Sequence, residues 1–338
     1  MRRRACRIAA ATVALVLAGC AGTAPMVGVG DAPADRVRYR EDWIGEKAID
    51  RSVRFEAFDS VHAGGLVSYH IALPPEYDAE PDARYPVVYW LHGSGGGVAG
   101  IPRLAAYFRS AIASREIPPV IVVFPNGLAE GMYCDWKDGS TLVERVIVDD
   151  LVAHIDASFR TIPSREGRIL DGFSMGGYGA ARFGFKYPDR FGAISMLGAG
   201  PVQRDFLTAP RTSEARRREV LGRVYGGDLA FFEEVSPWRL AEKHAARLRT
   251  LRTPIRIAVG SRDETLAANE ALHEHLEALG IAHEYQVLPG VAHEPMRVLM
   301  SLRASQWQWY RSVLPKGPAL DARARQVLHG GREGREID

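Results

Sequence analysis

The sequence predicts an α/β protein built on a mostly parallel, doubly wound sheet. Two features indicate this fold class: short apolar runs alternate with helical patterns along most of the chain, and the runs end at glycine, proline or polar residues. Strands that alternate with helices generally pair in parallel, and helices then cover both faces of the sheet. The chain has 338 residues, which is enough for one large domain or two small ones.

The N-terminal segment is predicted to direct export rather than to join the fold. Residues 2–4 are arginines, and residues 8–17 form an apolar stretch that is too short for a permanent membrane span. The stretch ends in Leu17-Ala18-Gly19-Cys20, which resembles the lipobox of bacterial lipoproteins. We therefore expect residues 1–20 to be a lipoprotein signal peptide. Lipidated Cys20 would then anchor the protein to a bacterial membrane, facing the periplasm or the cell exterior. An ordinary secretory signal with cleavage nearby is the alternative.

The rest of the chain divides into a tether, a domain and a tail. Residues 21–40 are rich in alanine, glycine, proline and charge, which predicts a flexible tether. Residues 316–338 are predicted to form a charged C-terminal tail, so the compact domain covers residues 41–315. Within the domain, residues 201–250 interrupt the alternation of strands and helices with an arginine-rich, helical pattern. We expect this segment to be a cap-like insert that lies over a cleft.

The expected elements of the domain follow one another in order. Residues 67–73 alternate apolar and polar side chains, which predicts a half-buried, antiparallel edge strand. Apolar runs predict buried strands at residues 85–91 and 119–124, and a similar run at residues 168–173 has one polar break. The remaining expected strands cover residues 191–197, 255–259 and 283–288, and the expected helices cover residues 103–115, 142–159, 269–279 and 296–314.

One of the predicted turns carries a pattern with chemical meaning. Residues 172–176 read Gly-Phe-Ser-Met-Gly, the G-x-S-x-G pattern of a nucleophile elbow, and a small-residue helix pattern follows at residues 177–181. A serine on such a strand-to-helix turn projects its hydroxyl group into a cleft, and the glycines permit the tight turn. We therefore predict that Ser174 is a catalytic nucleophile. The alternative is a glycine-rich turn with no catalytic role.

An acid and a base follow Ser174 in the order that this type of site requires. Asp263 comes just after the strand at residues 255–259, and His293 lies in the loop after the strand at residues 283–288. The carboxyl ends of parallel strands meet at one edge of a sheet, where ligands bind. We predict that His293 is the general base and that Asp263 orients it. The neighbouring Glu264 could take the place of Asp263.

Two backbone N–H groups are expected to stabilise the oxyanion of a tetrahedral intermediate. One belongs to Met175, next to the nucleophile. The other belongs to Ser94 or Gly95, in the glycine-rich loop after the strand at residues 85–91. Glycines in that loop allow its backbone to approach a substrate carbonyl group closely.

Four further residues are expected to line a substrate pocket. His92 and Gly93 lie in the same glycine-rich loop as Ser94. Tyr133 and Trp136 lie in the loop after the strand at residues 119–124. This aromatic pair could line an acyl or aromatic pocket, or it could simply pack in the interior.

Composition and residue spacing exclude several classes of function. The formal net charge of +2 and the scattered basic residues argue against nucleic-acid binding. No cluster of histidine, cysteine and acidic residues has metal-ligand spacing, so we expect neither a metal nor a cofactor. Of the 3 cysteines, Cys6 lies in the predicted signal and Cys20 is the lipidation site. Cys134 is then left without an intrachain disulfide partner, and no base is indicated that would make it a nucleophile.

Five motifs give the sequence a family resemblance. They are residues 91–96 (Leu-His-Gly-Ser-Gly-Gly), 124–127 (Phe-Pro-Asn-Gly), 171–177 (Asp-Gly-Phe-Ser-Met-Gly-Gly), 186–191 (Lys-Tyr-Pro-Asp-Arg-Phe) and 260–263 (Gly-Ser-Arg-Asp). Over about residues 55–312 the chain resembles the esterase D-like esterases of the α/β-hydrolase superfamily. These are related to feruloyl esterases, S-formylglutathione hydrolases, enterochelin esterases and mycolyltransferases. The resemblance implies an α/β-hydrolase fold and the hydrolysis or transfer of an acyl group through Ser174, Asp263 and His293, without a cofactor.

The expected function is therefore that of a serine carboxylesterase. Small-molecule or carbohydrate-linked esters, such as feruloyl or acetyl esters, are the expected substrates. Export argues against S-formylglutathione, which is a cytosolic compound. The alternatives are an acyltransferase with the same triad, a siderophore-ester hydrolase, and a catalytically silent α/β-hydrolase that only binds its ligand.

Overall fold

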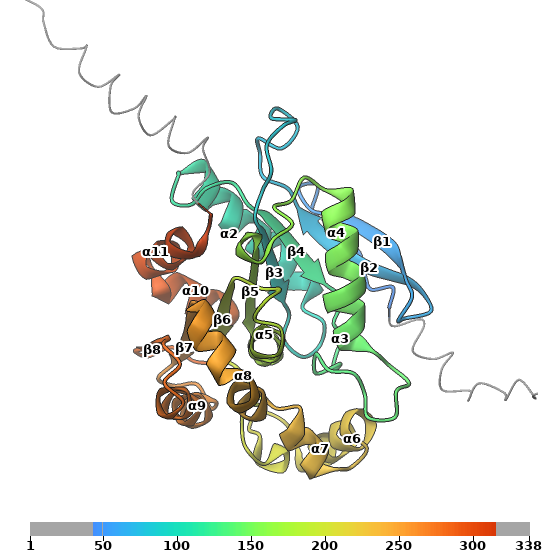
Figure 1. Cartoon of the computed structure of the whole chain (residues 1–338), viewed down its shortest axis with the longest axis vertical. Coiled ribbons are helices and arrows are strands. Elements are labelled where there is room, and N and C mark those ends of the chain that lie inside the picture. The colour runs from blue at the N-terminus through green and yellow to red at the C-terminus, as the bar shows by residue number, and fades with distance from the viewer. Residues whose placement is uncertain (1–42, 49, 316–338) are drawn as a thin grey trace, which may run out of the picture.

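The computed structural model describes residues 43–48 and 50–315, and this part of the chain forms one eight-stranded sheet (Figure 1). The strand order is β1-β2-β4-β3-β5-β6-β7-β8. The strands are β1 (Arg54–Ser60), β2 (Gly65–Ala72), β3 (Val87–Leu91), β4 (Ile121–Pro125), β5 (Arg168–Phe173), β6 (Ala193–Leu197), β7 (Ile255–Gly260) and β8 (Glu284–Leu288). Strands β1 and β2 pair antiparallel, β2 also meets β4 antiparallel, and all the other pairs are parallel. The expected mostly parallel sheet with an antiparallel edge is confirmed.

The central strands owe their position to their apolar sequences. Every residue of β3, β4, β6 and β7 is buried, as expected for parallel strands covered on both faces. At one edge, β1 is half exposed and carries charged and apolar residues in a mixed order. Because of that mixture, the sequence pattern alone does not predict β1. Strand β1 forms through its antiparallel hydrogen bonds with β2, which cannot be predicted from the residue pattern of β1 alone.

Helices cover both faces of the sheet and enclose two hydrophobic cores. The helices on these faces are α2 (Ile101–Ala113), α4 (Val152–Ser158), α5 (Met175–Lys186), α8 (Pro237–Leu251), α9 (Leu266–Ala278), α10 (Pro295–Leu302) and α11 (Ala304–Val313). One core contains residues of α2, α10 and α11, and the other contains residues of α4, α5, α8 and α9. The sheet is therefore doubly wound, as the sequence predicts, and it has the α/β-hydrolase architecture.

Two of the expected helices are less regular than their sequences suggest. The segment expected to be helical at residues 142–159 consists of α3 (Val143–Arg145), a π-helical stretch (Val146–Leu151) and α4. The segment expected at residues 296–314 is broken at Arg303, whose φ of 49° is incompatible with a continuous right-handed helix. The chain turns there between α10 and α11.

The predicted insert is helical and lies beyond one end of the sheet (Figure 1). It begins with a short 3₁₀ turn (Phe206–Thr208) and continues through α6 (Glu214–Tyr225) and α7 (Leu229–Glu234). Side-chain oxygens of Ser213 and Asp228 cap α6 and α7. By contrast α8, which the prediction included in the insert, packs against α5 and α9 and belongs to the layer that covers the sheet. The part that borders the pocket is thus shorter than residues 201–250.

The predicted signal peptide at 1–20, the tether at 21–40 and the tail at 316–338 lie outside the described residues, as does Cys20. Among residues 43–48 and 50–315, no helix is long and apolar enough to cross a membrane.

Candidate active site

Ser174 occupies a strained turn between β5 and α5. Its backbone has φ 58° and ψ −120°, a conformation that is costly for a residue with a side chain. Hydrogen bonds hold this conformation: the Ser174 N–H donates to the carbonyl oxygen of Leu197 at 3.0 Å, and the Ser174 carbonyl oxygen accepts from the N–H groups of Tyr178 and Gly200, each at 3.0 Å. Strand β6, the loop after it and the first turn of α5 therefore fix the nucleophile elbow predicted for residues 172–176.

The two glycines of the elbow are required by close packing. A Cβ atom on Gly172 would lie 2.4 Å from the carbonyl carbon of Gly176. A Cβ atom on Gly176 would lie 1.8 Å from the carbonyl oxygen of Leu91, at the end of β3. Neither site can accept a side chain without moving backbone, so the elbow sits directly against its neighbouring strand.

Ser174, His293 and Asp263 form a continuous chain of hydrogen bonds. His293 Nε2 lies 2.9 Å from Ser174 Oγ, and His293 Nδ1 lies 2.7 Å from Asp263 Oδ2. The side chains of His293 and Asp263 are only 5% and 0% exposed. The second carboxylate oxygen of Asp263 accepts hydrogen bonds from the N–H and Oγ1 of Thr265, both at 2.8 Å. Ser174 and His293 are 119 positions apart in the chain, and Asp263 and His293 are 30 positions apart. The folded sheet brings the three residues together.

The charge state of Asp263 determines the direction of these hydrogen bonds. Burial alone would raise the pKa of Asp263, but the hydrogen bonds from His293 and Thr265 outweigh it, so the pKa lies below its usual value. The ionised carboxylate can only accept, and therefore His293 Nδ1–H donates to it. His293 Nε2 is then free to accept the hydroxyl proton of Ser174. This arrangement can convert a serine hydroxyl group into a nucleophile.

The alternative acid, Glu264, lies outside this chain of hydrogen bonds. Its carboxylate is 55% exposed and binds Arg211 Nη1 at 2.7 Å. Asp263 alone of the two neighbours reaches the imidazole of His293.

The loop after β3 runs beside Ser174. A Cβ atom on Gly93 would lie 3.3 Å from Ser174 Cβ, and Ser94 Oγ lies 3.8 Å from the sulfur of Met175. Met175 is the first residue of α5, where backbone N–H groups have no partner within the helix. Ser94 and Met175, the oxyanion donors predicted from the sequence, thus lie together beside the Ser174 side chain.

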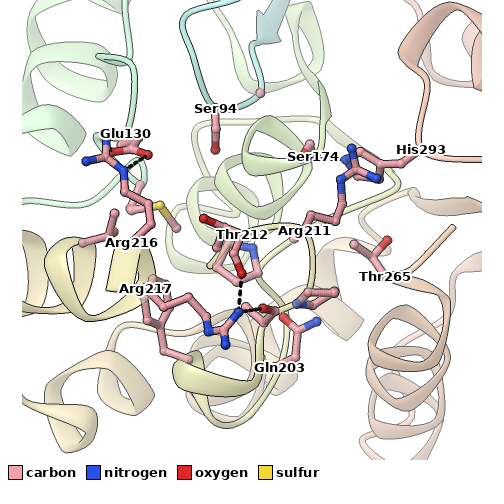
Figure 2. A pocket seen from close by; sticks show the side chains of 18 of the residues that line it. Ser94, Glu130, Ser174, Gln203, Arg211, Thr212, Arg216, Arg217, Thr265 and His293 are labelled. Atoms are coloured by element: carbon pink, nitrogen blue, oxygen red, sulfur yellow. Dashed lines mark hydrogen bonds and ion pairs between the residues drawn. The ribbon is translucent and has the colours of Figure 1, made fainter. Parts of the chain in front are cut away.

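A cavity of about 510 Å³ opens at Ser174 and His293 (Figure 2). Its size is in the range of small-molecule sites. Ser94 and Phe173 line the side formed by the sheet edge, and the insert lines much of the rest. The residues from the insert are Pro201, Gln203, Phe206, Ala209, Pro210, Arg211, Thr212, Arg216, Arg217 and Val220. The expectation that the insert covers a cleft beside Ser174 agrees with this lining.

A second cavity of about 820 Å³ adjoins the other side of the glycine-rich loop. It shares Gly93, Gly97, Phe173 and Pro295 with the first cavity, and Trp90 and Phe124 contribute apolar walls. The loop that carries Ser94 therefore separates two open spaces.

Known proteins place this chain in a family. The model of the Esterase family, described as "Putative esterase", matches residues 60–317. The chain belongs to the Esterase family. An esterase of Mycobacterium tuberculosis is 28% identical over 276 residues, which cover 74% of this chain and 59% of that protein. This chain thus spans less than two thirds of that relative's length. A protein of Xylanibacter ruminicola named endo-1,4-beta-xylanase/feruloyl esterase is 29% identical over 166 residues, covering 46% of this chain and 22% of the relative.

Solved structures show the same fold. A ferulic acid esterase aligns with a TM-score of 0.63 at 21% identity, covering 77% of this chain and 97% of that one. An S-formylglutathione hydrolase from Agrobacterium tumefaciens aligns with a TM-score of 0.62 at 19% identity, covering 78% and 95%. The Esterase family member described here therefore has the α/β-hydrolase fold that its motifs implied.

The prediction that Tyr133 and Trp136 line the pocket of this Esterase family member needs correction. Both residues are buried, and neither lines the two cavities beside the glycine-rich loop. The hydroxyl group of the buried Tyr133 donates to the carbonyl oxygen of His92 at 3.0 Å, so Tyr133 supports the glycine-rich loop from the protein interior. Gly93 lines both cavities, whereas His92 lines the second cavity alone. The pKa of His92 is lowered by burial, and its Nε2 accepts from Gly127 N–H at 3.0 Å, which gives it a structural role.

Several pocket residues were not singled out from the sequence. Glu130, Arg211, Arg216 and Arg217 all line the first cavity. The arginine-rich composition of residues 201–250 was the available signal, but it does not say which arginines face the pocket.

Among the described residues no group of three or more histidine, cysteine or acidic side chains could hold a metal ion. Cys134 is buried, and burial raises the pKa of its thiol to about 12, so it is not a ready nucleophile.

Proposed function

We propose that this protein is a serine carboxylesterase whose catalytic triad is Ser174, His293 and Asp263. One observation carries the proposal: the continuous hydrogen-bond chain from Ser174 Oγ through His293 to Asp263, at 2.9 and 2.7 Å, at the mouth of a cavity. Membership in the Esterase family and the named esterase relative support it. If these residues had no shared role, three side chains from distant segments of the chain would have to form this hydrogen-bonded geometry by chance.

The proposed reaction proceeds through an acyl-enzyme. His293 Nε2 takes the hydroxyl proton as Ser174 Oγ attacks the ester carbonyl carbon, and Asp263 stabilises the imidazolium ion that forms. The backbone N–H groups of Met175 and Ser94 donate to the oxyanion. The tetrahedral intermediate then breaks its bond to the alcohol oxygen, which receives the proton from His293. Water, activated by the same imidazole, attacks the acyl-enzyme and releases the acid.

Substitution of the nucleophile tests the proposal. Ser174→Ala should lower kcat for p-nitrophenyl acetate by roughly 10⁶-fold, to the background set by the remaining groups. Ser114→Ala, at an exposed serine after α2, is the matched control and should retain activity. Both variants should show the wild-type melting transition. Wild-type turnover in folded Ser174→Ala would refute the role of Ser174.

Feruloyl or acetyl esters on carbohydrates are the proposed substrates. The support is the relative from Xylanibacter ruminicola, whose name combines a xylanase with a feruloyl esterase. Comparing kcat/KM for feruloylated and acetylated oligosaccharides with that for siderophore esters tests the assignment. A strong preference for the siderophore esters would contradict it.

We further propose that Cys20 carries a lipid anchor that attaches the protein to a bacterial membrane, facing the periplasm or the cell exterior. The support is the Leu17-Ala18-Gly19-Cys20 sequence after a short apolar stretch. Metabolic labelling with a palmitate analogue should mark the wild type but not Cys20→Ser. Equal labelling of the two would contradict the anchor.

A further inference from the structure

The insert places a cluster of arginines around the pocket that Ser174 and His293 line. Arg211, Arg216 and Arg217 all contribute to its wall, and Figure 2 shows their side chains around the same space. Glu130 is the one carboxylate among the described lining residues. The charge of each arginine must therefore be balanced by a protein carboxylate, by solvent or by a ligand.

Two of the three arginines are already paired with carboxylates. Arg216 binds Glu130 through two nitrogen atoms, with Nε 2.9 Å from Oε1. Arg211 binds Glu264 at 2.7 Å. The positive charges of these two side chains are largely balanced within the protein.

Arg217 differs from its neighbours because it makes no ion pair within residues 43–48 and 50–315. Its Nη1 donates to the backbone carbonyl oxygens of Ala209, at 2.9 Å, and of Thr212. These carbonyl groups satisfy two donors but carry no net charge. Arg217 helps to lower the pKa of Glu214, yet the hydrogen bonds of that carboxylate go to Arg218, which lowers the pKa more strongly. Among the three arginines that line the pocket, Arg217 is thus the one whose positive charge no carboxylate of the described residues balances through an ion pair.

The rest of the wall suits a ligand with an apolar skeleton and a polar end. Phe206, Val220 and Met132 supply apolar surface between the insert and the sheet. On the same wall Gln203 has its Oε1 atom buried, with no hydrogen-bond partner among the described residues. A guanidinium group in a concave site, partly shielded from water, binds a carboxylate more strongly than it would on an open surface.

We propose that the pocket selects anionic esters, and that Arg217 binds a carboxylate carried by the substrate at a distance from the scissile ester. The proposal rests on the esterase function assigned to Ser174 and narrows its substrates: among the proposed carbohydrate esters, those that also carry a carboxylate, as on a uronic acid, are preferred. The carboxylate can belong to the acyl chain or to the alcohol. The ester group lies at Ser174, and the apolar skeleton lies along the pocket wall between Ser174 and Arg217.

Two matched pairs of esters test the proposal. In the acyl pair, the half-ester of adipic acid with p-nitrophenol is compared with p-nitrophenyl heptanoate. In the alcohol pair, 4-acetoxybenzoate is compared with its methyl ester. For each pair the quantity of interest is the ratio of kcat/KM for the anionic ester to kcat/KM for the neutral ester. A ratio taken on one protein sample does not depend on how much of that sample is folded.

The variants separate charge from structure. Arg217→Gln should lower the ratio for one pair by about 10- to 100-fold, which is the worth of a charge-assisted hydrogen bond. Arg217→Lys removes the planar group that binds the Ala209 and Thr212 carbonyl oxygens but keeps the charge, so it should retain more of the ratio. Arg218→Gln is the matched control, since Arg218 is the next residue of α6, does not line the pocket and binds Glu214. Its ratios should equal those of the wild type. Raising the salt concentration should lower the wild-type ratio and leave that of Arg217→Gln unchanged.

The outcomes separate this proposal from the esterase function itself. Ratios that are the same in the wild type and Arg217→Gln for both pairs would overturn the anion site, while Ser174-dependent turnover would still support the esterase. Equal losses in Arg217→Gln and Arg217→Lys would also overturn it, because charge would then not be the cause. If no ester is turned over, the esterase function fails. The anion site is then judged by calorimetric titration of Ser174→Ala with monomethyl adipate: weaker binding after adding Arg217→Gln supports the site, and equal binding overturns it.

Discussion

Two glutamates show how differently the two sides of this molecule are held together. Glu144, in the helical layer over the sheet, is 3% exposed. Its carboxylate binds Arg182 at 3.1 Å, Lys186, and the hydroxyl group of Tyr187 at 2.5 Å. Burial opposes ionisation of Glu144, but the charges of Arg182 and Lys186 outweigh it and hold its pKa below the usual value.

Glu130, on the loop that faces the insert, also binds two cations but in contact with solvent. It is 17% exposed, and its partners Arg216 and Arg223 are 40% and 28% exposed. Both partners belong to α6, so this carboxylate joins the insert to the rest of the domain. The insert is therefore held in part by ion pairs that water and salt can weaken, alongside buried apolar side chains such as Val224 and Phe232.

The difference indicates that the proposed catalytic groups and the proposed selectivity site are held in place by different physical interactions. Ser174, Asp263 and His293 lie in the turns and loops that follow β5, β7 and β8, and the side chains of Asp263 and His293 are almost fully buried. The arginines that surround the pocket lie on an insert attached in part by solvent-exposed charges. Changes on the sheet side should therefore cost rate or stability, whereas changes on the insert side should alter which ester is preferred.

After the loss expected for Ser174→Ala, the largest expected effect is also on the sheet side, at the acid of the proposed triad. Asp263→Asn should lower kcat by about 10⁴-fold, because an amide no longer selects the tautomer in which His293 Nε2 accepts the serine proton. Glu264→Gln, one position along the chain and exposed, is the control and should change kcat little. Steady-state kinetics with p-nitrophenyl acetate measures both. Similar losses in the two variants would mean that the acid has been assigned incorrectly.

The next effect is on stability, also on the sheet side. Glu144→Gln should reduce the free energy of unfolding by about 3–5 kcal/mol, because it leaves the buried Arg182 guanidinium without its carboxylate. Urea unfolding measures this change. Glu166→Gln, at a carboxylate that is 65% exposed, serves as the control and should cost less than about 1 kcal/mol. A change for Glu144→Gln as small as that of the control would remove the distinction between the two sides.

The smallest expected effect is on the insert side. Glu130→Gln should lower the free energy of unfolding by about 1 kcal/mol or less, since its ion pairs remain in contact with water. It should still raise the ratio of kcat/KM for anionic esters to kcat/KM for neutral esters. The reason is that Arg216 would lose part of its balancing negative charge, which leaves more positive charge beside the pocket. A loss of stability equal to that of Glu144→Gln would show that the insert is as tightly integrated as the sheet side.

The sheet and the candidate triad could be read from the sequence because short-range patterns determine them. Ser174 lies in a turn whose glycines are required locally, and Asp263 and His293 follow apolar runs that the sheet places side by side. Tyr133 could not be placed in this way. Its ring fills the space left by Gly127 and Gly179, where an added Cβ would come within 2.5 Å of it. That packing joins segments far apart in the chain.

The sequence pattern also does not predict that Arg217 lines the pocket. Residues 216–218 are three consecutive arginines on α6, and each points in a different direction around the helix. The position of α6 against the sheet edge determines which of them face the pocket. Arg217 lines the pocket with its charge unpaired, whereas Arg218 pairs with Glu214.

Covalent labelling of the intact protein tests the central claim most directly. A fluorophosphonate probe reacts with a serine only when that serine is activated, and peptide mass spectrometry locates the adduct. The account predicts a single adduct at Ser174 that disappears in His293→Ala, with loss of esterase activity in step with labelling. Full esterase activity in protein whose Ser174 is unlabelled, or an adduct at another serine that accounts for the inhibition, would contradict it.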